Sequence, residues 1–135
     1  MTFANADLFP ITATVTDGGR LSLGGRDAVE LASEFGTPLL VYDEATLRGI
    51  CREFVGEFTS RYPKSRVLYA SKAYVNPALA RLVHGEGLGL DVVSGGELAV
   101  VLAAGVDPSV IYFHGNNKTP EELQGALDAS IGRGV

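Results

Sequence analysis

The sequence predicts an α/β fold in which parallel strands alternate with helices. From residue 66 onward, short apolar runs typical of buried strands alternate with capped helical segments in the order βαβαβα. The loops between them are short, which favours helical crossovers between parallel strands. Three parallel strands do not make a stable end product, and a (β/α)8 barrel needs about 250 residues. We therefore expect the amino-terminal part of a longer enzyme; the alternative is a complete, small flavodoxin-like sheet.

The first 43 residues predict strands and turns rather than a repeated unit. Alternating apolar residues at 9–16 indicate a strand, and a glycine-rich turn separates it from a short strand at 21–23. A short helix is expected at 28–34, closed by Gly36. The apolar run at 39–42 predicts a buried strand.

A long helix is predicted at residues 44–62, with Asp43 as its N-cap and Pro63 as its end. Cys51 lies beside the apolar face of this helix, and we interpret it as a small buried residue. We expect that apolar face to be buried, and its residues recur at steps of three and four: Leu47, Ile50, Phe54 and Phe58.

Three further strands are predicted at residues 66–71, 88–93 and 110–114. Capping residues mark the helices that follow them: Asn76 with Pro77, Ser94 with Glu97, and Thr119 with Pro120 and Glu122. Residues 132–135 are expected to be the loop into a fourth strand that the sequence does not contain.

The amino-acid composition argues against several classes of function. The apolar fraction is 46%, the charged fraction 20% and the net charge −5, which argues against binding to nucleic acid or an anionic membrane. No apolar run approaches the roughly 20 residues of a membrane helix. Cys51 is the single cysteine, so no internal disulfide is expected. The first seven residues lack the pattern of a signal peptide, and we expect a cytoplasmic protein.

Polar residues follow the predicted strands at their carboxyl ends, where parallel sheets place their chemistry. They are Lys72, Asp91 with Ser94, and His114 with residues 116–117. A desolvated lysine is a nucleophile toward carbonyl groups, whereas a neighbouring aspartate favours the ammonium form and would orient it. The alternatives remain open: a solvated Lys72, an Asp91 that binds loop amides, and a structural His114. We predict no metal site.

Gly95 and Gly96 open a predicted helix and are candidates to bind a phosphate through backbone amides. Turn and capping chemistry explains them first, because they form no phosphate-binding loop of known spacing.

Four segments resemble a known family. Residues 69–73 (YASKA), 89–98 (GLDVVSGGEL) and 114–118 (HGNNK) are similar to successive motifs of the diaminopimelate decarboxylases, and residues 37–43 (TPLLVYD) resemble the entry strand of that family. One departure is the Tyr74-Val75 pair before Asn76, since the family often has asparagine soon after Lys-Ala.

The resemblance implies a fold-type III pyridoxal phosphate enzyme with an alanine racemase-like barrel. Residues 1–43 would then be the amino-terminal segment of a separate β-domain. Residues 44–135 would be the first three β/α units of a (β/α)8 barrel that binds the cofactor. Lys72 matches the lysine that attaches pyridoxal 5'-phosphate covalently and is the expected catalytic residue. Asp91 and His114 are expected to contact the cofactor.

The resemblance also implies the reaction: decarboxylation of meso-2,6-diaminopimelate to L-lysine by a homodimer. The remaining cofactor and substrate groups of the family lie beyond Val135, so we expect the 135 residues alone to be inactive. The alternatives are another fold-type III decarboxylase, for ornithine, arginine or carboxynorspermidine, a non-catalytic pyridoxal phosphate-binding barrel, or a truncated product without function.

Overall fold

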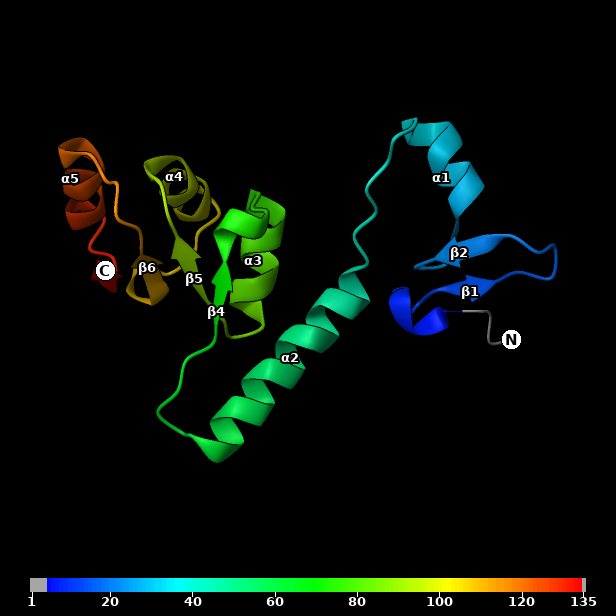
Figure 1. The fold of residues 1–135 in the computed structure, drawn as a ribbon, viewed down its shortest axis with the longest axis horizontal. Helices are drawn as coiled ribbons and strands as arrows, with labels where there is room; N and C mark the ends of the chain where they lie inside the picture. The colour runs from blue at the N-terminus through cyan, green and yellow to red at the C-terminus, as the bar shows by residue number, and fades with distance from the viewer. Residues whose placement is uncertain (1–4, 135) are drawn as a thin grey trace. The chain divides into compact units, whose positions relative to one another are not determined.

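A computed structural model describes residues 5–134 (Figure 1). The chain divides into two compact units, Met1–Ile50 and Cys51–Val135. Helix α2 (Glu44–Arg61) runs through the division. The predicted boundary between residues 43 and 44 stays a prediction. Among residues 5–134, no helix is both long enough and apolar enough to cross a membrane.

The first unit contains a small antiparallel sheet of β1 (Thr14–Val15), β2 (Leu21–Leu23) and β3 (Arg26–Asp27), in that order. Helix α1 (Ala28–Phe35) follows directly, and the side chain of Asp27 caps it by accepting from two amides of its first turn. The predicted short strand and helix are confirmed. The strand predicted at 9–16 is reduced to β1, because residues 10–13 form a turn.

Asp43 joins the turn before β1 to the start of α2. Its Oδ1 accepts from the Thr46 amide at 2.8 Å, which confirms it as the N-cap, and its Oδ2 accepts from the Thr12 hydroxyl at 2.5 Å. These bonds, with the Thr12 hydroxyl first, lower the pKa of the Asp43 carboxyl. The Thr12 hydroxyl oxygen also accepts from the Gly24 amide at 2.9 Å.

The strand predicted at residues 39–42 is wrong. These residues form no strand, and Leu40 is 84% exposed. Their apolar pattern fits a buried strand, but a strand also needs a partner for its backbone hydrogen bonds. No strand within residues 5–134 pairs with this segment.

The second unit contains a four-stranded parallel sheet in the order β4-β5-β6-β7. Its elements after α2 are β4 (Leu68–Ala70), the 3₁₀ helix η2 (Ser71–Ala73), α3 (Pro77–Gly85), β5 (Gly89–Val92), α4 (Gly95–Ala103), η3 (Pro108–Val110), β6 (Ile111–Phe113), α5 (Pro120–Asp128) and β7 (Arg133–Gly134). The fourth strand was expected outside the sequence; the structure corrects this, because its first two residues already pair with β6.

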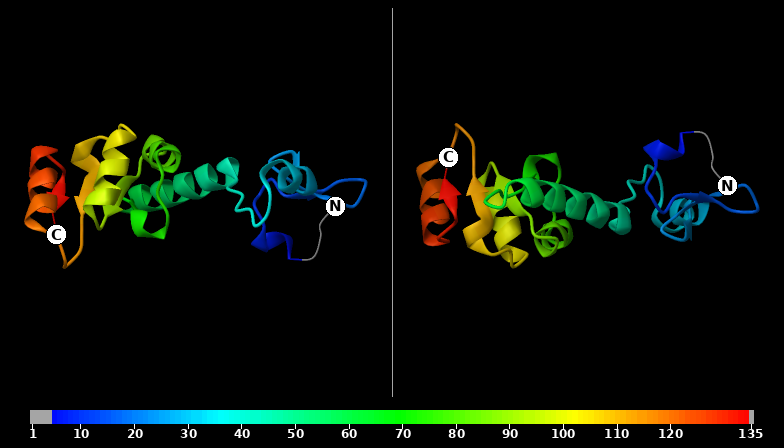
Figure 2. Two further views of the ribbon diagram at one scale, coloured as in Figure 1. Left: turned by 90° about the horizontal axis from the view of Figure 1, so that it is seen from above. Right: turned by 90° about the horizontal axis from the view of Figure 1, so that it is seen from below.

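Each strand pairs with the strand before it in the chain, without a reversal of order. A flavodoxin-like sheet requires such a reversal, whereas a (β/α)8 barrel has sequential order. Helix α4 packs between α3 and α5, so the three helices follow one another along the sheet (Figure 2). The strand order therefore favours the first part of a barrel over the flavodoxin-like alternative.

The two faces of the parallel sheet differ in burial. Side chains on one face are at most 1% exposed and form the core with the helices: Leu90, Val92, Ile111 and Phe113. The register pairs Ala70 with Asp91, Asp91 with Tyr112, and Tyr112 with Arg133, which places these four residues on the opposite face. Asp91 and Tyr112 are only partly buried there.

Helix α2 is confirmed, but its predicted buried face is wrong. Phe54 and Phe58 are 52% and 49% exposed, and Ile50 is 47% exposed. On the neighbouring face Cys51 is buried, as expected, and the exposed Arg52 side chain forms a two-point ion pair with Glu86 at the end of α3. Periodicity identifies the apolar face of a helix. It does not show whether the 135 residues contain an element that packs against that face.

Candidate functional site

The candidate site is the rim formed by the carboxyl ends of β4, β5 and β6. Lys72 lies in η2, immediately after β4, and its side chain is exposed. Within residues 5–134 its amine makes no hydrogen bond or ion pair. The strand ends because Ser71 begins a 3₁₀ turn, which places Lys72 at the rim rather than in the ladder.

Asp91 and His114 meet on the two neighbouring strands. Asp91 belongs to β5, and its Oδ2 lies 3.8 Å from Nδ1 of His114, which follows β6. The His114 amide donates to the Val92 carbonyl at 2.9 Å and so extends the ladder by one residue. The Asp91 side chain is 21% exposed and the His114 side chain 61% exposed. The structure therefore brings these two predicted residues together at the rim.

The second oxygen of Asp91 lacks a hydrogen-bond partner among residues 5–134. Its Oδ1 is buried and accepts no hydrogen bond from the described residues. Because burial of an unpaired carboxylate oxygen is costly, this atom is suited to receive a donor from a bound molecule. No hydrogen bond or ion pair joins Asp91 to Lys72 among residues 5–134. The register Ala70↔Asp91 nevertheless puts Asp91 on the strand next to the Lys72 turn.

Other residues near the rim cap a helix or make contacts within a loop. The Ser94 hydroxyl accepts from the Glu97 amide at 3.2 Å and caps α4. Lys118 donates to the Gly115 carbonyl, and its Nζ lies 5.2 Å from the centre of the Phe113 ring. Residues 116–117 are exposed. These contacts give Ser94 and Lys118 structural roles.

Gly95 is not a free phosphate-binding amide. It donates to Oε1 of Glu122, at 2.7 Å, from the next helix. The second oxygen of Glu122 accepts from the Thr119 amide at 2.9 Å. The Thr119 amide, and after it the Gly95 amide, lowers the pKa of Glu122. A carboxylate thus already satisfies the start of α4, so turn and capping chemistry accounts for Gly95.

Sequence reasoning missed two residues on the face that carries Asp91. Tyr112 on β6 and Arg133 on β7 share its row through the strand register. The alternation of faces along each strand could have indicated them, since residues two apart in a strand share a face. However, the row appears only when the register between strands is known. A shallow pocket lined by residues 61–65 lies before β4, at the end of the sheet opposite Lys72.

The rim residues fit the reactive end of pyridoxal phosphate. The Lys72 amine is exposed, has no partner in the described part of the chain and is available to an aldehyde, and the buried Asp91 Oδ1 can accept from a donor. The described residues do not offer an equally clear place for the phosphate, because Glu122 occupies the Gly95 amide. The fit therefore concerns Lys72 and its neighbours on β5 and β6.

Comparison with known proteins gives consistent matches. The profile of the family described as "Pyridoxal-dependent decarboxylase, pyridoxal binding domain" matches residues 48–135. The diaminopimelate decarboxylase of Bacillus methanolicus is 49% identical over 121 residues, which cover 90% of this chain and 28% of that protein. The chain thus spans 28% of the length of this relative.

Two solved structures extend the comparison. The diaminopimelate decarboxylase of M. jannaschii in complex with L-lysine has a TM-score of 0.80 and 38% identity, covering 92% of this chain and 29% of that one. The arginine decarboxylase of Paramecium bursaria Chlorella virus has a TM-score of 0.54 and 26% identity, covering 62% and 23%. These likenesses confirm the predicted fold class.

Proposed function

The chain belongs to the pyridoxal-dependent decarboxylase family through its pyridoxal-binding domain, and from this membership we propose that the protein decarboxylates meso-2,6-diaminopimelate to L-lysine and CO2. One observation carries the choice of substrate. Among solved structures, the likeness to a diaminopimelate decarboxylase bound to L-lysine, at 38% identity, exceeds the likeness to an arginine decarboxylase, at 26%.

Lys72 is the proposed catalytic residue and attaches the cofactor. Its position after β4 leaves the amine exposed and without a partner among the described residues. Asp91 and His114 are the proposed cofactor contacts. Asp91 would use the buried Oδ1 as an acceptor, and Nδ1 of His114 lies 3.8 Å from the other oxygen of Asp91.

When bound, pyridoxal phosphate supplies an electron sink for the carbanion left by loss of CO2. The residues of this chain bind the cofactor, orient it and carry protons. Lys72, in the turn directly after β4, would bind the cofactor through Nζ and is the candidate to deliver a proton from that atom.

The division of the chain belongs to the same proposal. Residues 1–43 are assigned to a β-domain and residues 44–135 to the first β/α units of the cofactor-binding barrel. The antiparallel sheet β1-β2-β3 and the sequential parallel sheet β4-β5-β6-β7 support this assignment. We further propose that the enzyme is a cytoplasmic homodimer. Residues 1–135 alone are expected to lack activity.

The experiment compares Lys72→Ala with Lys64→Ala, an exposed lysine at the opposite end of β4. Full-length protein is mixed with pyridoxal phosphate, and visible absorbance and CO2 release are recorded. The substrates are meso-diaminopimelate, ornithine and arginine. We expect Lys72→Ala to lose the absorbance band and more than about a thousandfold of the activity, while Lys64→Ala keeps both.

A normal absorbance band in Lys72→Ala would contradict the assignment of Lys72. Faster release of CO2 from ornithine or arginine than from diaminopimelate would contradict the proposed substrate.

A further inference from the structure

The turn that carries Lys72 is short and has no side-chain cap at its start. It is a three-residue 3₁₀ helix whose N-cap, Ala70, makes no side-chain capping bond. The Ser71 side chain is buried, and its hydroxyl has no partner among the described residues. Short 3₁₀ turns have poor internal geometry, so the position of Lys72 depends on contacts from outside the turn.

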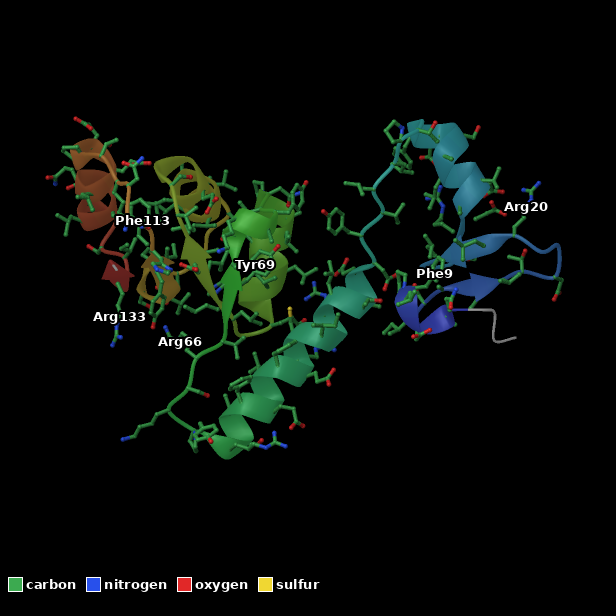
Figure 3. All side chains as sticks on the ribbon, viewed as in Figure 1. Phe9, Arg20, Arg66, Tyr69, Phe113 and Arg133 are labelled. Carbon is green, nitrogen blue, oxygen red and sulfur yellow. The ribbon has the colours of Figure 1, made fainter. Side chains whose placement is uncertain are left out.

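Tyr69 supplies such a contact. Its hydroxyl donates to the Tyr74 carbonyl at 2.7 Å. Tyr69 precedes Lys72 by three residues and Tyr74 follows it by two, so this bond joins the two ends of the segment that contains Lys72. Tyr69 itself lies in β4 (Figure 3), where it pairs in register with Leu90 of β5. The bond therefore ties the far end of the turn to the sheet.

Asn76 holds the same segment from the other side. Its Nδ2 donates to the Tyr74 hydroxyl at 3.1 Å, while its Oδ1 accepts from the Leu79 amide at 2.8 Å. The second bond is the N-cap of α3, and Leu79 is buried in the core. Tyr74 is thus held through its carbonyl by the sheet and through its hydroxyl by the helix.

We propose that Tyr69, Tyr74 and Asn76 are positioning residues that fix the turn carrying Lys72 and so direct its amine toward the aldehyde of the cofactor. This inference rests on the proposed function of Lys72. The neutral amine forms a C=N bond with the aldehyde carbon, and its two hydrogens leave with the aldehyde oxygen as one water. Holding the nitrogen in place reduces the entropy cost of that encounter.

The variants separate the two contacts. Tyr69→Phe removes the donor to the Tyr74 carbonyl. Asn76→Ser removes the donor to the Tyr74 hydroxyl but keeps a residue that caps helices well. Tyr74→Phe removes the same second bond from its other side. Tyr62→Phe is the matched control, since Tyr62 is 67% exposed and precedes β4 at the opposite end of the strand.

The first measurement is amide hydrogen exchange in residues 71–75 of the full-length protein without cofactor. Loss of either bond is expected to speed exchange about 3- to 10-fold, as for loss of one hydrogen bond. Tyr62→Phe should leave it unchanged. Unchanged exchange in Tyr69→Phe and Asn76→Ser would overturn the proposal.

The second measurement is the rate at which pyridoxal phosphate labels Lys72, trapped with sodium borohydride and mapped by peptide mass. We expect the rate to fall about 3- to 10-fold in Tyr69→Phe and Asn76→Ser, with thermal midpoints near that of Tyr62→Phe. Faster exchange with an unchanged labelling rate would mean that these bonds stabilise the turn without positioning Lys72, and it would overturn the proposal. If wild-type Lys72 is not labelled, the proposed function itself fails, and this inference falls with it.

Discussion

Two buried oxygen atoms near Lys72 lack hydrogen-bond partners within residues 5–134: Ser71 Oγ and Asp91 Oδ1. They have different expected consequences. Asp91 lies on the face of the sheet left open by the helices, where a ligand can supply a donor. The Ser71 hydroxyl is neutral, and replacing it removes a buried polar group that gains nothing in the fold.

Ser71→Ala is therefore expected to leave the free energy of unfolding unchanged or to raise it by up to about 1 kcal/mol, since a buried unpaired hydroxyl destabilises. Ser94→Ala is the matched control. It removes the cap of α4 and should lower stability by about 1 kcal/mol. Urea unfolding of both variants gives the comparison, and a clear loss of stability in Ser71→Ala would contradict the account.

The sequence allowed the rim residues to be predicted because strand ends can be read from apolar runs. Lys72, Asp91 and His114 each follow or end such a run, and the structure joins the last two. Tyr112 and Arg133 were not found, because their place in the same row as Asp91 depends on the register between strands. The partner of Gly95 was also hidden, since Glu122 lies 27 residues away.

Among the elements, α4 and α5 are joined by the Glu122 carboxylate, which accepts from the amides of Thr119 and Gly95. These amides lower the pKa of Glu122 below its ordinary value. The folded state therefore binds a proton less readily than the unfolded chain. The stabilisation is present above the unfolded pKa, about 4.3, and is lost as pH falls through the lowered folded pKa.

Glu122→Gln is accordingly expected to lower the thermal midpoint at pH 7 and to differ less from wild type as the pH falls below about 4. Glu121→Gln, at the neighbouring exposed position of α5, serves as the control and should follow wild type. Thermal unfolding across this pH range provides the measurement. A constant difference between Glu122→Gln and wild type at every pH would rule out the carboxylate as its source.

Gly89 lets β5 lie between its neighbours. A Cβ there would stand 2.5 Å from the Val110 carbonyl oxygen and 2.6 Å from a Leu68 methyl carbon. Gly89→Ala is expected to destabilise the fold by about 1–3 kcal/mol, because backbone cannot yield as a side chain does. In contrast, Gly125→Ala in α5, with open space around it, should stabilise by up to about 1 kcal/mol. Equal effects by urea unfolding would refute this contrast.

The caps show what local sequence can specify. Asn76 with Pro77, and Thr119 with Pro120, were predicted from their residue types and occur as helix starts. The exposure of Phe54 and Phe58 on α2, and of residues 39–42, was not predicted. A cap is complete within four residues, whereas burial needs a partner elsewhere in the fold.

For the whole molecule, the exposed apolar side chains predict how residues 1–135 behave when produced alone. Leu40, Phe54 and Leu127 are 84%, 52% and 72% exposed, and surfaces of this kind promote association. We expect residues 1–135 alone to bind a hydrophobic dye and to associate with rising concentration. Full-length protein should bind less dye per mole. A monomer without dye binding, by sedimentation, would contradict this expectation.

A control tests whether α2 contributes to that association. The double variant Phe54→Gln/Phe58→Gln removes two half-exposed aromatic rings from one helix face without changing the charge. It should reduce dye binding and association of the 135 residues, whereas Glu53→Gln, on an exposed position of the same helix, should not.

The sequential strand order has a consequence for biosynthesis. In the parallel sheet, β5, β6 and β7 each pair with the strand made before them, so the sheet can grow in the direction of translation, one unit at a time. The three hydrogen bonds described around Lys72 join residues that lie between Tyr69 and Leu79 in the sequence. The residues that form these bonds are therefore all synthesised by the end of α3, whereas the sheet that anchors Tyr69 needs β5, and His114 follows β6.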